Sequence, residues 1–337
     1  MNRRGLLKMT TALGAGGATV YAGMLLAAEN AGSALAGARK ATSNGAAGTN
    51  TAAAANAVVG SSPIAELPRA SFIHRKDGTA LFYKDWGTGT PVVFLHGAGL
   101  NSNMWMYQMV PLTAHGMRCV AYDRRGHGRS SDPGRGYDFD TLADDLAAVL
   151  EALNLRNVTL VGHSMASGEI VRYLTRHGSG RVLRVAMLGP TTPFLMKTAD
   201  NPEGYDRAAF EALRALWLKD FPKWLKDNSP PFFMPETSPQ MHEWGTAMMY
   251  QTSFQAQIQC NIAVTETDFR AELPNIKVPV LVIHGTRDVS APIALTGQRT
   301  AKLIPGATLK VYEGAPHGLF VTHMEQVNQD LLAFIRG

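Results

Sequence analysis

Short runs of apolar residues alternate with longer amphipathic segments from about residue 67 onward. The apolar runs have the length of buried strands, and they cover residues 91–96, 118–122, 158–161, 185–188, 278–283 and 309–312. Helical spacing of apolar residues lies between them, at residues 103–115, 141–153, 164–173, 295–303 and 324–335. Asp140 is predicted to cap the second of these helices. The alternation predicts an α/β fold, a mostly parallel central sheet flanked by helices.

Two parts of the chain depart from this alternation. Residues 71–74 and 80–85 flank a turn with the sequence DG, which predicts an antiparallel hairpin at the start of the domain. Residues 191–275 are helical and irregular, and they are rich in Trp, Phe, Met and Pro. A long insertion between two strands of one sheet is typical of a cap over the carboxyl ends of the strands. Open α/β sheets bind their ligands at that edge.

Residues 1–66 have a different character. The stretch NRRGLLK at residues 2–8 is similar to a twin-arginine export motif, an uncharged stretch follows at residues 9–28, and residues 34–36 supply the cleavage site ALA. We predict a twin-arginine-type signal peptide over residues 1–36. The protein is then periplasmic or secreted, with no stable membrane insertion after cleavage. An uncleaved anchor formed by the uncharged stretch is the alternative, since about 20 apolar residues span a bilayer, but its many Gly and Thr residues disfavour it.

Residues 37–66 are predicted to be a flexible linker. As far as about residue 63 they are mainly Ala, Gly, Ser, Thr and Asn, without an aromatic residue. This composition buries too little apolar surface to offset the chain entropy that ordering would cost. The folded part is therefore a single domain, residues 67–337, with its cap at about residues 191–275.

Charge and cysteine content narrow the classes of partner. The formal net charge of +5 is mild, and Arg3, Arg4 and Lys8 contribute to it within the first eight residues. No later block interleaves basic and aromatic residues, so nucleic acid is not an expected partner. The two cysteines, Cys119 and Cys260, lack metal-ligand spacing, and Cys119 lies in an apolar run where burial is expected. We infer no disulfide framework.

Ser164 stands where a predicted strand gives way to a helix, within the stretch LVGHSMASG at residues 160–168. A nucleophile on such a tight turn needs small neighbours, because the strand and helix backbones approach closely. Gly162 and Ala166 are both small, although the familiar G-x-S-x-G motif has glycine at the second position. On this stretch alone, a catalytic serine and an ordinary serine at a strand end both remain open.

The positions of an acid and a histidine favour the catalytic interpretation. A serine hydroxyl needs a general base that a carboxylate orients, and in this type of fold the chain order is serine, acid, histidine. Asp288 follows the predicted strand 278–283, and His317 follows the predicted strand 309–312. All three residues therefore fall at one edge of the sheet, which predicts a triad of Ser164, His317 and Asp288.

Backbone donors for an oxyanion are also predicted. The glycine-rich loop at residues 96–99 follows a strand, so the Ala98 N–H can point into the site, and the Met165 N–H is the second donor. The other histidines, including His163 and His284, have structural interpretations. No histidine pair has the spacing of a zinc-binding helix, and no metal or cofactor is predicted.

Several stretches together resemble the α/β-hydrolase superfamily. They are HG at 96–97, DRRGHGRS at 123–130, GHSM at 162–165, ETDF at 266–269, APHG at 315–318 and DLLAFI at 330–335. The chain is most similar to the cofactor-free bacterial haloperoxidases and aryl esterases, also labelled non-heme chloroperoxidases. The resemblance covers residues 67–337. It implies a serine hydrolase that acts on carboxylic esters, with peracid formation as a side activity.

Two sites in the sequence depart from that group, one at Ala166 and one at Ala98 and Gly99. Ala166 replaces the glycine after the nucleophile, which the need for small size tolerates. Ala98 and Gly99 stand where these relatives often carry a tryptophan followed by proline or leucine. The loss of the large ring is expected to widen the acyl side of the pocket, and it weakens the expectation of peracid formation.

The cap is expected to select the substrate. Its apolar candidates are Phe194, Leu195, Trp217, Phe232, Phe233, Trp244, Met248 and Met249. Residues at helical spacing more often belong to a core, so only Phe194 and Phe233 are predicted to line the pocket. None of the candidates is charged, which favours a small hydrophobic or aromatic ester or lactone as the small-molecule partner.

The residue type of the nucleophile discriminates between other activities of this fold. A serine at position 164 disfavours haloalkane dehalogenases and most epoxide hydrolases, which use aspartate there, and dienelactone hydrolases, which use cysteine. Hydroxynitrile lyases and carbon–carbon bond hydrolases share the triad and stay open. Two further alternatives are peracid formation as the main activity, which needs no haem or metal, and a non-enzymatic ligand-binding homologue.

Overall fold

The computed structural model describes residues 71–337. The predicted signal peptide (residues 1–36) and linker (residues 37–66) lie outside the described residues. No helix within the described part of the chain is both long and apolar enough to cross a bilayer.

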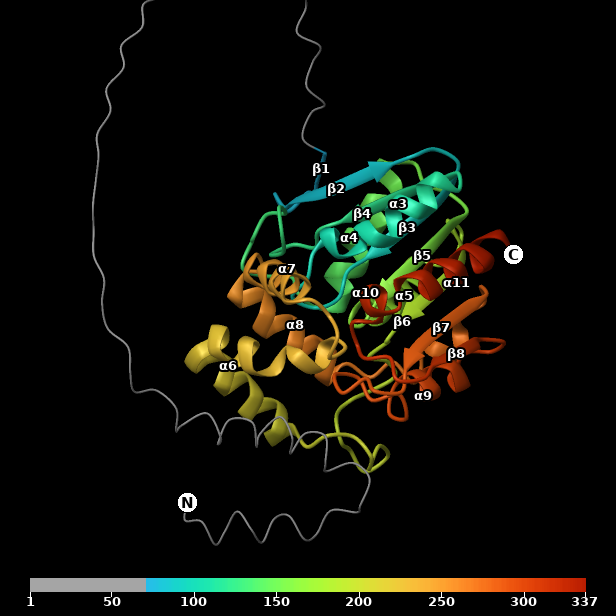
Figure 1. Ribbon diagram of the computed structural model, residues 1–337. Coiled ribbons are helices and arrows are strands. Elements are labelled where there is room, and N and C mark those ends of the chain that lie inside the picture. The colour runs from blue at the N-terminus through green and yellow to red at the C-terminus, as the bar shows by residue number, and fades with distance from the viewer. Residues whose placement is uncertain (1–70) are drawn as a thin grey trace, which may run out of the picture.

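An eight-stranded sheet forms the centre of the molecule (Figure 1). Its strands, in spatial order, are β1 (Phe72–His74), β2 (Ala80–Trp86), β4 (Met117–Tyr122), β3 (Thr90–Leu95), β5 (Val158–His163), β6 (Val182–Leu188), β7 (Val280–Gly285) and β8 (Thr308–Tyr312). β1 and β2 form the predicted hairpin, and β2 pairs with β4 in antiparallel fashion. All other neighbours pair in parallel, so their carboxyl ends share one edge. The α/β-hydrolase fold predicted from the sequence is confirmed.

Helices cover both faces of the sheet. One face packs against α4 (Phe139–Ala152) and α5 (Ala166–His177), and the other packs against α3 (Met106–Ala114), α10 (Leu319–Thr322) and α11 (Met324–Arg336). The side chains of strand β3 alternate between the two faces of the sheet. Val93 and Leu95 enter the core on the side of α4 and α5, while Val92 and Phe94 enter the core on the side of α3, α10 and α11. Both sets are apolar since the strand is buried on two sides, which is why it appears in the sequence as a continuous apolar run.

The segment between β6 and β7 forms its own group of helices. It contains α6 (Arg207–Asn228), α7 (Pro239–Tyr250) and α8 (Phe254–Glu266), with the short helix η3 (Pro230–Phe232) between the first two. Figure 1 shows α6, α7 and α8 gathered at one end of the sheet. Helix α6 is kinked at Asp220, two residues before Pro222, whose ring and missing N–H break helical hydrogen bonding. We call residues 191–275 the helical insert.

One predicted helix boundary was wrong. Helix α4 begins earlier than expected, and its N-cap is Asp138, whose carboxylate accepts a hydrogen bond from the Thr141 N–H at 2.9 Å. Asp140 lies in the first turn instead, where it pairs with Arg172. The reason is the burial of Phe139, whose ring meets that of Phe269 at 5.0 Å and draws the first turn into the core.

Candidate active site

Ser164 occupies a left-handed turn between β5 and α5. Its φ is +56°, which is uncommon for a residue other than glycine, and its N–H donates to the Leu188 carbonyl at 2.9 Å. The turn is tight enough to exclude larger neighbours. A methyl group added to Gly162 would lie 2.7 Å from Ile170 Cδ1 and 2.9 Å from Ala166 Cβ. Alanine at position 166 is therefore accommodated because position 162 is glycine.

His317 and Asp288 are joined by a short hydrogen bond. His317 follows β8 and Asp288 follows β7, and 2.6 Å separates Nδ1 of the histidine from Oδ2 of the carboxylate. The other oxygen, Oδ1, accepts the backbone N–H groups of Ser290 at 2.9 Å and Ala291 at 2.7 Å. The Asp288 carboxylate is thus oriented by backbone donors on one side and holds the imidazole with the other.

The surroundings of Asp288 keep it ionised. Burial raises the pKa of its carboxyl group, but the charge of His317 and hydrogen bonds from His284 and His317 outweigh burial and hold the pKa well below its usual range. The residue is only 4% exposed, so water contributes little to this balance. A buried carboxylate of this kind can stabilise positive charge on the imidazole it contacts.

His284 is a second histidine at the same carboxylate, and the sequence carried no signal of this contact. Its Nε2 lies 3.1 Å from Asp288 Oδ2 and 2.8 Å from the Ala291 carbonyl oxygen. Its Nδ1 is buried without a hydrogen-bond partner among the described residues, so the proton is placed on Nε2. The contact depends on the turn after β7, whose shape no local pattern predicts.

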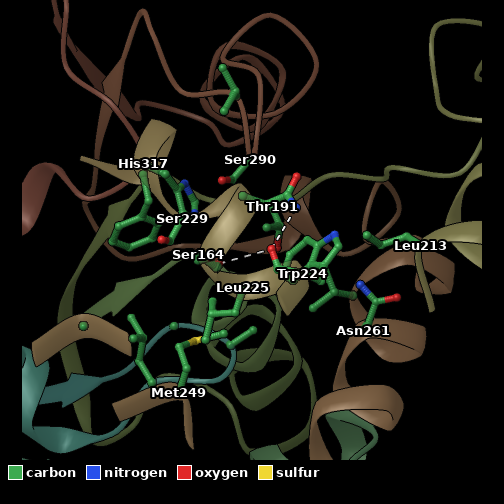
Figure 2. A pocket seen from close by; sticks show the side chains of 18 of the residues that line it. Ser164, Thr191, Leu213, Trp224, Leu225, Ser229, Met249, Asn261, Ser290 and His317 are labelled. Atoms are coloured by element: carbon green, nitrogen blue, oxygen red, sulfur yellow. Dashed lines mark hydrogen bonds between the residues drawn. The ribbon is translucent and has the colours of Figure 1, made fainter. Parts of the chain in front are cut away.

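A cavity of about 230 Å³ opens between the carboxyl edge of the sheet and the helical insert. Ser164 and His317 both line it, as Figure 2 shows. Within residues 71–337, no hydrogen bond joins the side chains of Ser164 and His317. Such a hydrogen bond is often absent before substrate binds. Ala98 also lines the cavity, beside Gly97, while Met165 is fully buried next to Ser164 at the start of α5.

The cavity wall is mostly apolar, and its ionisable members are His163 and His317 alone. His163 lies behind the site, where its Nε2 is 2.9 Å from the His317 carbonyl oxygen. Burial and the charge of His317 hold the pKa of His163 well below its usual range, so its ring is neutral. Members of the insert that line the cavity include Leu195, Leu213, Trp217, Trp224, Leu225, Phe232, Phe233 and Met249.

One of the two predicted pocket residues lies elsewhere. Phe233 lines the cavity, but Phe194 does not, and its neighbour Leu195 does instead. Phe194 packs into a small core with Leu195, Met196 and Phe210, of which Leu195 and Phe210 also line the cavity. The Arg270 guanidinium lies 5.3 Å from the centre of the Phe194 ring. The chain is not helical there, so residue spacing could not show which members of this small core reach the cavity.

The loop that departs from the related sequences is closely covered. Gly99 has a φ of +70°, and a methyl group added to it would lie 2.6 Å from the Met249 side chain and 2.8 Å from Gln257 Oε1. Met249, from α7, therefore occupies space next to the loop. The wider acyl side expected from the loss of a large ring is thus partly filled by the insert.

Buried ion pairs anchor the polar stretch at residues 123–130. Arg124 is buried in an ion pair with Glu169 of α5, and Arg125 is buried against Asp145 of α4, with Nε 2.7 Å from Oδ2. These pairs tie the loop after β4 to the two helices on one face of the sheet. No cluster of three or more His, Cys, Asp or Glu residues suited to a metal ion occurs among residues 71–337.

Comparison with known proteins agrees with this architecture. The family model for the alpha/beta hydrolase fold matches residues 90–324, which is more than half of the chain. The chain therefore belongs to the α/β-hydrolase family, and it is an enzyme of that superfamily.

Within the superfamily, the chain is similar to proteins named for two related activities. It is 41% identical over 267 residues to a non-heme chloroperoxidase of Kitasatospora aureofaciens, with 77% of this chain and 97% of the other covered. It is 36% identical over 274 residues to a bifunctional esterase/perhydrolase of Acinetobacter calcoaceticus, with 79% and 99% covered. The solved structure of an esterase from Exiguobacterium antarcticum superimposes with a TM-score of 0.77 at 34% identity, and the match covers 80% of this chain and all of the other.

Proposed function

We propose that this protein is a serine hydrolase that cleaves carboxylic esters through an acyl-enzyme. The observation that carries the proposal is the 2.6 Å contact between His317 and a buried, ionised Asp288, at a cavity that Ser164 also lines. A histidine oriented by a carboxylate is the arrangement that activates a serine hydroxyl. The esterase names of similar proteins support the same activity.

Each residue then has a defined role. Ser164 attacks the ester carbonyl while His317 accepts the hydroxyl proton and passes it to the departing alcohol. Asp288 fixes the imidazole with its Nδ1 proton facing the carboxylate, and stabilises the imidazolium that develops. The Ala98 and Met165 N–H groups bind the oxyanion, and a water molecule, deprotonated by His317, releases the acid and frees Ser164.

The cavity supports a small neutral substrate. Its wall carries no Lys, Arg, Asp or Glu, so an ionic group on the substrate would lack a partner. Its volume of about 230 Å³ exceeds the roughly 150 Å³ that holds a benzene molecule in an engineered cavity. A hydrophobic or single-ring aromatic ester or lactone fits these limits.

Peracid formation is a second candidate activity, because a similar protein is named an esterase/perhydrolase and another a chloroperoxidase. In this reaction hydrogen peroxide replaces water as the group that attacks the acyl-enzyme. The acyl carbon–serine oxygen bond breaks, a peracid leaves, and the peracid oxidises halide in solution. The same three residues serve both activities, so the fate of the acyl-enzyme distinguishes them.

The test is hydrolysis of p-nitrophenyl acetate and butyrate by the purified protein and its Ser164→Ala variant. We expect turnover in the wild type and none in the variant, with unchanged circular dichroism. Equal rates in the two proteins would contradict the assignment of Ser164. Bromide oxidation in acetate buffer with hydrogen peroxide, measured with the same pair, reports on the second activity.

We also infer that the protein is exported by the twin-arginine route, on the pattern at residues 1–36. Amino-terminal sequencing of the protein recovered from its producing cells tests this inference. A mature terminus near residue 37, lost when Arg3 and Arg4 are replaced by Lys, is the expected result. A terminus that still includes residues 9–28 would indicate a membrane anchor instead.

A further inference from the structure

Asn261 is a polar side chain among mainly apolar residues of the cavity wall. It belongs to α8 and lines the cavity together with Leu213, Trp217 and Val264. Figure 2 shows it beside Leu213 and Trp224, on the side of the cavity away from His317. A polar group at this place is remote from the bond that Ser164 would attack, so it can act only on another part of the substrate.

The orientation of the Asn261 amide is determined by Arg214. The Arg214 Nη1 group, from α6, donates to Asn261 Oδ1 at 3.2 Å. A guanidinium has donors only, so the atom facing it must be the amide oxygen and not the nitrogen. Arg214 is itself only 11% exposed, and its Nη2 lies 3.8 Å from Glu266, which fixes the guanidinium in turn.

The amide nitrogen of Asn261 consequently faces the cavity. In Figure 2 it lies on the side of Trp224, with the oxygen turned away. No hydrogen bond from Nδ2 to another residue is formed within residues 71–337, and the nearby Thr265 hydroxyl is engaged with the Asn261 backbone carbonyl at 2.9 Å. The amide nitrogen is therefore free to donate to an oxygen of a ligand that fills the cavity, and a hydrogen bond formed there adds binding free energy.

The lining residues also define the charge of that oxygen. Arg214 does not reach the cavity, and its charge is opposed by Glu266, while no other Lys, Arg, Asp or Glu lines the wall. We propose that the preferred substrate is a neutral ester or lactone with a second carbonyl oxygen, which accepts a hydrogen bond from Asn261 Nδ2. The inference rests on the proposed serine hydrolase activity and names its substrate class.

Matched substrates test the proposal with the full-length protein. Ethyl hexanoate is compared with ethyl 3-, 4- and 5-oxohexanoate, in which a carbonyl replaces one methylene group, by pH-stat measurement of kcat/KM. We expect at least one oxo ester to be preferred by about tenfold, the usual size of one added hydrogen bond to a partly buried donor. Because the intrinsic reactivity of each ester is the same for every variant, the change in this ratio isolates the contact.

Two substitutions at position 261 and one elsewhere complete the design. Asn261→Leu removes the donor, and Asn261→Asp retains a partner for Arg214 while replacing the donor by an acceptor. Both are expected to lower the ratio about tenfold from its wild-type value, whereas Thr246→Val, a change at another polar lining residue, is expected to leave the ratio unchanged. Asn261→Asp keeps the test valid if Asn261→Leu fails to fold.

Each result that contradicts the expectation has a different meaning. No preference for any oxo ester in the wild type, or a preference that survives both Asn261 substitutions, would overturn the proposal. A preference for the carboxylate of monoethyl adipate that depends on Asn261 would overturn the requirement for a neutral acceptor. Failure to hydrolyse any ester in a Ser164-dependent manner would instead refute the underlying hydrolase function.

Discussion

His317 Nδ1 lies 2.6 Å from Asp288 Oδ2, and both residues are almost completely buried. The carboxylate is charged because four donors point at it, two backbone N–H groups at one oxygen and two histidines at the other. With the charge retained and water excluded, the electrostatic interaction between Asp288 and an imidazolium is strong.

Replacing Asp288 by Asn should nearly abolish catalysis while leaving the fold intact. The amide keeps the size of the side chain but removes the charge, and it no longer requires the Nδ1 proton to face it. By analogy with other serine triads we expect kcat to fall about 10⁴-fold. The rate of p-nitrophenyl butyrate hydrolysis measures this, and a loss of less than tenfold would exclude Asp288 as the orienting acid.

The lowered pKa of Asp288 should make stability depend on pH at the acidic end. Because the folded-state pKa lies below the value of about 3.9 in the unfolded chain, the folded state binds fewer protons than the unfolded state. The stabilisation is therefore complete above about pH 4 and is lost as the pH falls further. Urea unfolding at pH 3, 4 and 7 should show a smaller acid-induced loss in Asp288→Asn than in the wild type. Identical losses would show that Asp288 makes no such contribution.

His284→Phe should impair catalysis without touching substrate. The substitution removes the N–H that lies 3.1 Å from Asp288 Oδ2, so the carboxylate is held less firmly against His317, which lowers kcat. With one donor fewer, the carboxylate also favours the imidazolium form of His317 in the free enzyme. We expect kcat to fall about tenfold and the acidic limb of the kcat/KM profile to move to higher pH. His284→Gln, which places an N–H near the same position, should restore part of both. A lower rate with an unmoved pH profile would indicate a purely structural role.

Ser164 should be strained by its own backbone. A left-handed φ of +56° costs a residue with a side chain about 1–2 kcal/mol, whereas glycine adopts it freely. Both Ser164→Gly and Ser164→Ala are expected to be inactive. Ser164→Gly should nevertheless be more stable than Ser164→Ala by about 1 kcal/mol in urea unfolding, after allowance for the greater unfolded-state entropy of glycine. Equal stabilities would show that the turn relaxes without cost.

Gly162→Ala should be destabilising because the turn leaves no room for a methyl group. The nearest atoms, on Ile170 and Ala166, would lie 2.7 and 2.9 Å from it, and overpacking of this kind costs about 1–3 kcal/mol. Gly180→Ala is a suitable control, since an added methyl group there meets nothing within 4 Å. A destabilisation of the two variants by the same amount would mean that close packing at the turn is not the reason for glycine.

The positions of Ser164, Asp288 and His317 could be predicted at one edge of the sheet because each follows a parallel strand. Buried strands are recognised in the sequence as continuous apolar runs, and parallel pairing places all their carboxyl ends at one edge of the sheet. Small residues around Ser164 likewise reflect a steric requirement that is local in the chain. Fold and approximate site therefore follow from periodicity and from the short-range geometry of turns.

Only the tertiary structure decided which side chains of the helical insert face the cavity. Leu195 lines it while Phe194 does not. The amide nitrogen of Asn261 faces the cavity because Arg214, from a different helix, donates a hydrogen bond to the amide oxygen. The contact of His284 with Asp288 depends in the same way on the shape of a turn. These features arise from packing between segments that are distant in sequence. No periodic pattern in the sequence of such segments predicts which way their side chains point. The sequence by itself determined the fold and where the reactive residues gather, and the tertiary packing of the insert decided what the cavity presents to a substrate.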